Sequence, residues 1–186
     1  MNIDPIIDFI TEAGKLKKLP RTGWVESGVQ EPESVADHSF RVILIALILA
    51  DVRGLDSLKV VRMALLHDLA EVETGDLTPL QKKADSIATK RAEEEVMNKL
   101  LLKLPEDIRE AYQLAWHEFS EASTQEAILI RDADKLEMVM QASEYQRDGY
   151  DSGKLMRFWH AEITGDEAKA IRDAVKSRSI RRAKKA

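Results

Sequence analysis

The sequence has no cysteine, and this absence excludes disulfide bonds and thiolate metal sites. Any metal ion in this protein must therefore be held by histidine, aspartate or glutamate side chains. Long apolar runs are also missing, because the longest, Val42 to Ala50, falls well short of the about 20 residues of a membrane-spanning helix. The first residues lack the basic segment that opens a signal peptide. We therefore expect no membrane partner and a cytoplasmic location.

Signals of β-structure are equally scarce. The chain has no β-branched run with two-residue alternation, no Asn-Gly hairpin signal, no internal repeat and no linker rich in glycine, proline or serine. Glycines and prolines instead separate stretches with helical periodicity, and 186 residues suit one core. The sequence predicts an all-α helical bundle of about seven to eight helices, organised as a single domain over residues 1–186.

The charge balance argues against a nucleic-acid polymer as a partner. Acidic residues outnumber basic ones by 33 to 28, and the net charge is -5. Non-specific affinity for a polyanion is therefore not expected from the whole molecule. The basic C-terminal tail, which includes Lys184 and Lys185, is interpreted as a solvated chain end.

Capping and breaking residues predict where individual helices begin and end. Ser34 and Asp37 resemble a capping box, so a helix should start there, run to Val52 and end at Gly54. The other expected helices cover Asp4 to Leu19, a stretch that starts near Asp56 or Ser57 and carries His67, Asp68 and Glu71, Pro79 to Leu104, a fifth that Pro105 opens, Thr124 to Arg147, and one or two within Ser152 to Arg182. The segment from Pro20 to Glu33 is expected to be irregular.

His67 and Asp68 form the most informative pair in the chain. His38 precedes them in the first turn of its expected helix, Glu71 follows one turn later, and Asp76 comes after a glycine. Imidazole nitrogens and carboxylate oxygens are the ligands of divalent transition ions. The sequence therefore predicts a metal site to which a distant helix contributes a further ligand.

Two aspartates on the expected helix over residues 124–147 compete for that last position. Asp134 shares a helical stripe with Ile130 and Met138, whereas Asp132 shares one with Leu129 and Leu136. Spacing alone leaves the choice between Asp132 and Asp134 open.

Residues 66–77 carry a specific resemblance. Their pattern resembles the H-D-x-x-E-x-x-x-G-D-L signature of the 5′-deoxyribonucleotidase branch of the HD-domain phosphohydrolases. Residues 34–39 are similar to the upstream histidine motif of that branch, and residues 130–134 are similar to its final-ligand helix. The resemblance covers about residues 15–150 and leaves the C-terminal helices, 151–182, outside it. It implies an HD-domain-like helical bundle, and it favours Asp134 over Asp132.

The resemblance also implies a role for each candidate residue. The expected metal ligands are His38, His67, Asp68 and Asp134, the expected substrate-binding residues are Arg21, Glu33 and Trp24, and the expected catalytic residues are Glu71 and Asp76. Glu71 would orient or deprotonate the attacking water, and Asp76 would donate a proton to the leaving 5′-oxygen, although these two roles are exchangeable. The ion would be divalent Mn, Co, Fe, Ni or Zn.

The predicted activity is the metal-dependent hydrolysis of deoxyribonucleoside 5′-monophosphates to deoxyribonucleosides and phosphate. The alternatives are an HD-type phosphodiesterase, a nucleotide pyrophosphohydrolase such as a (p)ppGpp hydrolase, and a non-catalytic nucleotide-binding regulatory module. A small-molecule nucleotide is the expected substrate, and a homodimer is the expected assembly. The native metal, the base preference and the choice between deoxyribose and ribose stay open.

Overall fold

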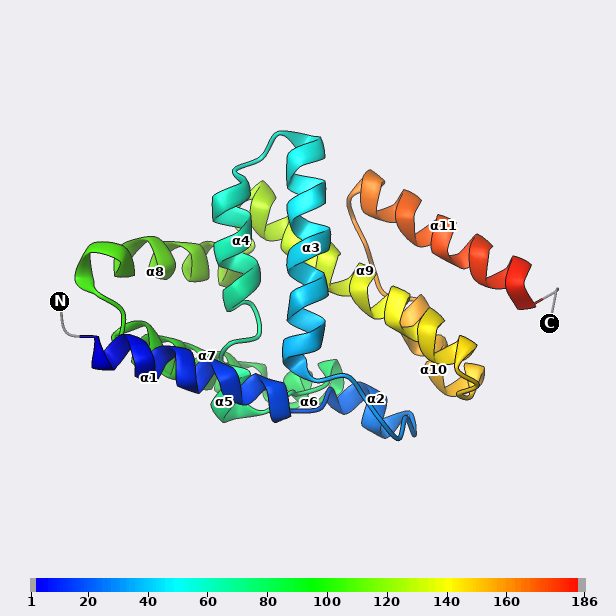
Figure 1. Cartoon of the computed structure of the whole chain (residues 1–186), viewed down its shortest axis with the longest axis horizontal. Helices are drawn as coiled ribbons and strands as arrows, with labels where there is room; N and C mark the ends of the chain where they lie inside the picture. Colours follow the sequence, from blue (N-terminus) through cyan, green and yellow to red (C-terminus); the bar gives the residue numbers. More distant parts are fainter. Residues whose placement is uncertain (1–2, 184–186) are drawn as a thin grey trace.

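The computed structural model describes residues 3–183, with side chains placed through residue 181 (Figure 1). Lys184 and Lys185 of the basic tail lie outside the described residues. In chain order the elements are α1 (Asp4–Ala13), the 3-10 helix η1 (Gly14–Lys18), α2 (Thr22–Glu26), α3 (Val35–Arg53), α4 (Ser57–Leu66), α5 (Glu71–Thr74), α6 (Pro79–Ala84), α7 (Ser86–Leu101), α8 (Glu106–Glu121), α9 (Gln125–Arg147), α10 (Ser152–Trp159) and α11 (Asp166–Ala183). Within residues 3–183 there is no strand, only an isolated bridge between Pro20 and Ser34, so the all-α prediction is confirmed.

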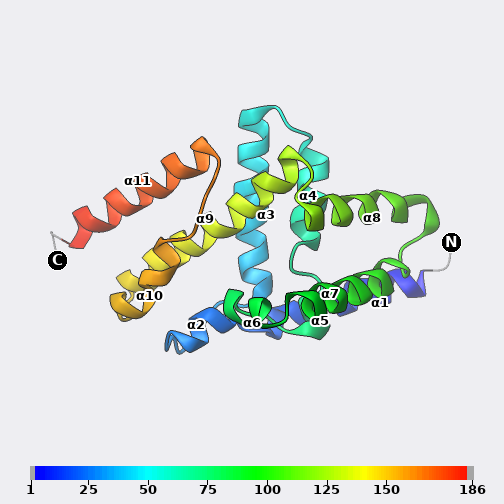
Figure 2. The ribbon, with the colours of Figure 1, turned by 180° about the vertical axis from the view of Figure 1, so that it is seen from behind.

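Within residues 3–183 the two longest helices, α3 and α9, cross at the centre of the molecule (Figures 1 and 2). The helix α4 packs beside both of them, and α10 and α11 lie along the far half of α9. Apolar side chains of α3, α4, α7 and α9 build the main core, which includes Val42, Met63, Met97 and Leu136. The start of α1 and the end of α11 lie at opposite ends of the molecule in both views.

The boundaries of α3 follow the sequence prediction. The Ser34 hydroxyl accepts a hydrogen bond from the Asp37 amide, and the Asp37 carboxylate accepts one from the Ser34 amide, which completes the capping box. Gly54 ends the helix with a φ of 65°, a left-handed conformation that favours glycine. This cap fixes the first turn, in which His38 lies.

The prediction that one helix carries His67, Asp68 and Glu71 is wrong. α4 ends at Leu66, residues 67–70 form a tight turn, and Glu71 opens the short helix α5. The turn is held by the Leu69 amide, which donates to the Leu66 carbonyl at 3.1 Å, and by the Glu71 amide, which donates to the Asp68 carbonyl at 3.1 Å. Because the turn changes the chain direction, neighbouring residues 67 and 68 can face the same point in space.

Three further boundaries differ from the prediction. The expected helix over residues 79–104 is broken at Asp85, whose carboxylate caps α7 by accepting from the Ala88 amide at 3.0 Å. The segment from Pro20 to Glu33, expected to be irregular, contains the short helix α2. The first α-helix ends at Ala13 and continues as the 3-10 helix η1. The helix number therefore exceeds the predicted seven to eight, because short helices that are set by local caps carry little periodic signal.

A second apolar cluster fixes α2 and α10 against the far half of α9. It is formed by Trp24, Val29, Ala142, Tyr145 and Leu155. None of the helices within residues 3–183 combines the length and apolar character needed to span a membrane.

Candidate active site

The imidazole rings of His38 and His67 turn their Nε2 atoms toward one point. The two Nε2 atoms lie 3.5 Å apart, and both rings are buried. Asp68 Oδ2 lies 3.1 Å from His67 Nε2 and 3.6 Å from His38 Nε2. The first turn of α3 and the turn after α4 thus bring three predicted ligands together.

Asp134 on α9 completes the cluster. Its Oδ1 lies 3.2 Å from His38 Nε2, and the ligand atoms of His38, His67 and Asp134 all lie within 4.8 Å of one another. Asp132 points elsewhere, because its carboxylate accepts hydrogen bonds from the backbone amides of Thr164 and Gly165 at 2.8 and 2.7 Å. The structure therefore groups His38, His67, Asp68 and Asp134 in one four-residue cluster. Asp132 instead binds the segment before α11.

A carboxylate behind the cluster orients His38. Glu137 Oε2 lies 2.6 Å from His38 Nδ1, so a proton on Nδ1 leaves Nε2 free to bind an ion. His67 is oriented in the same way by the Ala64 carbonyl, which lies 2.7 Å from its Nδ1. Arg41 donates to Glu137 from Nε and Nη2 at 2.9 and 2.7 Å.

The charges of the cluster suit a divalent cation. Burial raises the pKa of Asp68, but the neighbouring His67 outweighs burial and holds that pKa well below its usual range. Burial and Arg21 lower the pKa of His38, but Asp134 and Glu137 outweigh them and raise it to about 10, so the surrounding carboxylates favour a positive charge at this place. Two imidazoles and two carboxylates with facing ligand atoms are a donor set that fits a transition ion.

Arg21 joins the cluster to Asp76. Its Nη1 lies 3.2 Å from Asp68 Oδ2 and 3.2 Å from Asp76 Oδ1. The backbone amide of Thr22 also donates to Asp76. Arg21 and Asp76 are therefore held beside the cluster by charge-assisted hydrogen bonds.

Glu71 is buried next to these charges. Its Oε2 atom has no hydrogen-bond partner among the described residues, and its Oε1 lies 3.8 Å from Lys82 Nζ. Burial raises the pKa of Glu71, and Asp68 and Asp76 raise it further, to about 10. Glu71 is thus a buried carboxyl group with an uncommitted oxygen beside the predicted metal site.

A cavity of about 580 Å³ opens over the cluster and contains most of the predicted site residues. Its lining includes Arg21, Trp24, Asp68, Glu71, Asp76, Lys82, Arg131, Asp134, Met138 and Phe158. Trp24 is almost fully buried and packs against Phe158 with ring centroids 3.8 Å apart, so it both packs and lines the cavity. Glu33 lies behind this wall, where it accepts a hydrogen bond from Trp24 Nε1 at 2.8 Å.

Comparisons with known proteins identify the family. A family described as HD domain matches residues 13–177. The chain belongs to the HD domain family. The human protein named 5′-deoxynucleotidase HDDC2 is 40% identical over 157 residues, which cover 83% of this chain and 74% of that protein. The protein of that name from Dictyostelium discoideum is 38% identical over 151 residues, which cover 76% of this chain and 77% of that protein.

The crystal structure of the PH0347 protein from Pyrococcus horikoshii OT3 has a similar fold. It is 39% identical to this chain with a TM-score of 0.75, and the match covers 92% of this chain and 96% of that one. The predicted fold class is therefore confirmed, and the family match extends beyond the expected residues 15–150 into α11.

Several residues of this HD domain site were missed from the sequence. Glu137 lies three residues after Asp134 and Arg41 three residues after His38, and this spacing places each on the same helix face as the candidate ligand that precedes it. Phe158 and Lys82 come from α10 and α6 and gave no signal, because only tertiary packing brings them to the cavity.

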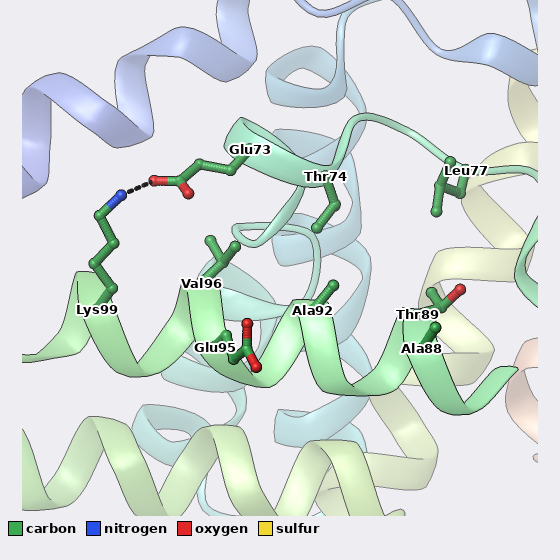
Figure 3. Close-up of a pocket in the computed structure, with 9 residues that line it drawn as sticks. All are labelled: Glu73, Thr74, Leu77, Ala88, Thr89, Ala92, Glu95, Val96 and Lys99. Carbon is green, nitrogen blue, oxygen red and sulfur yellow. Dashed lines mark hydrogen bonds and ion pairs between the residues drawn. The ribbon is translucent and has the colours of Figure 1, made fainter. Parts of the chain in front are cut away.

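A different cavity of about 580 Å³ lies between α5 and α7 (Figure 3). It is lined by residues such as Thr74, Ala92 and Val96, and the ion pair between Glu73 and Lys99 crosses one end at 2.6 Å. None of the predicted site residues lines this cavity. The cavity that opens above the four-residue cluster is therefore the better candidate for the active site.

Proposed function

We propose that this protein is a metal-dependent 5′-deoxynucleotidase, which hydrolyses deoxyribonucleoside 5′-monophosphates to deoxyribonucleosides and phosphate. The observation that carries the proposal is the convergence of His38, His67, Asp68 and Asp134 beside Arg21 at one cavity. The names of the human and Dictyostelium relatives, which match most of this chain, support the same activity.

The four clustered residues would hold the divalent cation. Bound there, it supplies neutralisation of phosphate charge and lowers the pKa of a water molecule. Glu137 and the Ala64 carbonyl keep the two imidazoles in the tautomer that presents Nε2. Manganese, cobalt, iron, nickel and zinc all suit this donor set, so the identity of the ion is a matter for experiment.

The two candidate catalytic carboxyl groups have different surroundings. Asp76 accepts hydrogen bonds from Arg21 and from the Thr22 amide, so its carboxylate is already engaged by two donors. Glu71 has one oxygen without a partner among the described residues, and its pKa is raised to about 10. A cation at the cluster would lower that pKa. We therefore favour the exchanged assignment, in which Glu71 donates the proton to the leaving 5′-oxygen and Asp76 aligns Arg21 and the attacking water.

Substrate profiling tests the activity itself. The purified protein is stripped with a chelator, each candidate ion is restored, and phosphate release is measured from deoxyribonucleoside and ribonucleoside 5′-monophosphates. Release from deoxyribonucleoside monophosphates is expected. Cleavage of diesters or of (p)ppGpp in their place would favour the phosphodiesterase or pyrophosphohydrolase alternatives, and binding without turnover would favour the regulatory module.

Leaving-group dependence tests the role of Glu71. Glu71→Gln should retain the metal but hydrolyse deoxyribonucleotides about 100-fold or more slowly, because general acid catalysis contributes on that order. The loss should shrink for an aryl phosphate, whose leaving group needs no proton. An equal loss on both substrates would assign Glu71 to the water instead.

A homodimer is the assembly that we propose. Four exposed apolar residues, Phe40, Leu44, Ile48 and Val52, follow one another at four-residue spacing on α3. A continuous apolar stripe of this kind is typical of a protein interface. The single domain over residues 1–186 and the cytoplasmic location stay predictions.

A further inference from the structure

Lys82 lies where two cavities meet. Besides the cavity that is lined by Trp24 and Phe158, a second one of about 350 Å³ extends toward α7 and α8 and is lined by residues such as Thr89 and Phe119. The two cavities share Asp68, Lys82, Arg131 and Asp134. A phosphate group bound at the four-residue cluster therefore lies beside the cations of this junction.

Arg21 alone is poorly matched to a phosphate monoester. The monoester carries nearly two negative charges at neutral pH. The guanidinium of Arg21 already contacts the carboxylates of Asp68 and Asp76 at 3.2 Å each. Its positive charge is therefore shared before any substrate arrives, and compensation of the phosphate calls for another cation in addition to the metal.

Of the two cations at the junction, Lys82 is the better placed to move onto a phosphate oxygen. Arg131 donates to the backbone carbonyls of Phe119 and Ser120 at 3.1 Å, which fixes its guanidinium. Lys82 Nζ instead contacts two carboxylates, Glu93 Oε1 at 3.0 Å and Glu71 Oε1 at 3.8 Å. A phosphate oxygen can take the place of a carboxylate oxygen at an ammonium group without loss of charge compensation.

Resting on the proposed function, we propose that Lys82 is a further phosphate-binding residue of this active site and that Glu93 holds its ammonium group until substrate binds. The geometry supports this exchange, because Lys82 lies on α6 and Glu93 on α7, and the contact between them is made by their side chains alone. Glu93 belongs to an acidic row, Glu93 to Glu95, and among the described residues it is the member of this row that forms an ion pair with Lys82.

Lys82→Met removes the ammonium group and keeps the aliphatic stem. We expect KM for deoxyribonucleotides and the inhibition constant of inorganic phosphate to rise by about tenfold or more, the size of a lost charge-assisted hydrogen bond. The kcat should change by less than about threefold, and Lys82→Arg should restore most of the phosphate affinity.

Lys99→Met is the matched control. It also breaks a lysine pair with a glutamate of α5, Glu73, but it does so in the other cavity (Figure 3). Both kinetic constants should stay at the value of the unmodified protein, and thermal melts of all variants show whether each is folded.

Glu93→Gln provides a test of opposite sign. It releases Lys82 and removes a negative charge near the phosphate, so inorganic phosphate should bind more tightly, by about two- to fivefold for a partly exposed pair. Titration calorimetry of the Mn²⁺-loaded protein with inorganic phosphate measures this directly and without turnover.

The outcomes separate this proposal from the proposed function. A folded Lys82→Met variant with unchanged phosphate affinity, or a loss confined to kcat, would overturn the role of Lys82. Weaker phosphate binding by Glu93→Gln would overturn the exchange. If the unmodified protein releases no phosphate from deoxyribonucleotides, the proposed function fails, and calorimetry with inorganic phosphate still decides whether Lys82 binds the anion.

Discussion

At the scale of single residues, Asp132 and Asp134 show how much two positions on one helix can differ. Both are acidic and both lie on α9, yet Asp134 faces His38 whereas Asp132 faces the backbone before α11. On a helix, residues two apart point in widely different directions. The pair therefore offers a controlled comparison between a candidate ligand and a structural carboxylate.

The first prediction uses that comparison. Asp134→Asn should lose metal uptake, because it removes a charged ligand from the cluster, while the chain stays folded. Asp132→Asn should keep the metal but destabilise the protein by about 1–3 kcal/mol, since its carboxylate accepts two backbone amides. Metal content and thermal melts measure both effects. Metal retention in Asp134→Asn would remove that residue from the ligand set.

A second residue-scale prediction concerns Glu33 and pH. Burial, and then the charge of Glu137, raise the pKa of Glu33 from 4.5 to about 7. Between these values the folded chain keeps a proton that the unfolded chain releases, so this group lowers the free energy of unfolding as pH rises from 4.5 to about 7.

Glu33→Gln should remove this dependence. Its amide oxygen can still accept from Trp24 Nε1, and the free energy of unfolding above pH 7 should increase by about 1–3 kcal/mol relative to the unmodified protein. Urea denaturation at several pH values between 4.5 and 8 provides the measurement. An identical slope in both proteins would show that Glu33 ionises normally.

At the scale of elements, the N-terminus of α3 links a local sequence signal to the site. The capping box of Ser34 and Asp37 holds the turn that contains His38. The capping signal and the terminal glycine are both local, so this helix was predictable from the sequence. The break after α4 was not predictable from the sequence, because residues 57–71 have continuous helical periodicity. Only their packing against α3 and α9 stabilises the turn at residues 67–70.

The third prediction concerns this cap. Ser34→Ala should lower the free energy of unfolding by about 1 kcal/mol and weaken metal binding severalfold, because the first turn becomes less ordered. Thr124→Ala is the control, since Thr124 caps α9 by accepting from the Ala127 amide, far along the helix from Asp134. It should cost similar stability, and its metal affinity in titration calorimetry should not change. Equal losses of affinity in the two variants would contradict the link between cap and site.

At the scale of the whole molecule, the sequence predicted the residues of the cluster better than the residues that line the cavity around it. The motif around His67 predicted a cluster that the fold indeed assembles from α3, the turn after α4 and α9. The cavity walls could not be predicted, because Phe158 reaches Trp24 from α10 and Lys82 reaches Glu93 across two helices. Such contacts depend on how helices pack, and a single sequence carries no direct record of that.

The fourth prediction concerns the apolar stripe on α3. Ile48→Glu places a charge in the middle of the exposed residues Phe40 to Val52 and should convert the proposed dimer into a monomer in light scattering after size-exclusion chromatography. Ile180→Glu, an equally apolar and exposed position on α11, serves as the control. A monomeric unmodified protein, or a dimer that survives the substitution, would refute the interface.

The contact between α2 and α10 joins two parts of the chain that contribute different residues to the cavity. Arg157 of α10 donates to the Gly23 carbonyl at 2.7 Å, and this contact joins segments that lie 134 positions apart. The predicted metal ligands all come before position 135, whereas Phe158, which forms one aromatic wall of the cavity, comes from α10. Exchange of the last helices would therefore alter this wall and leave the four-residue cluster in place.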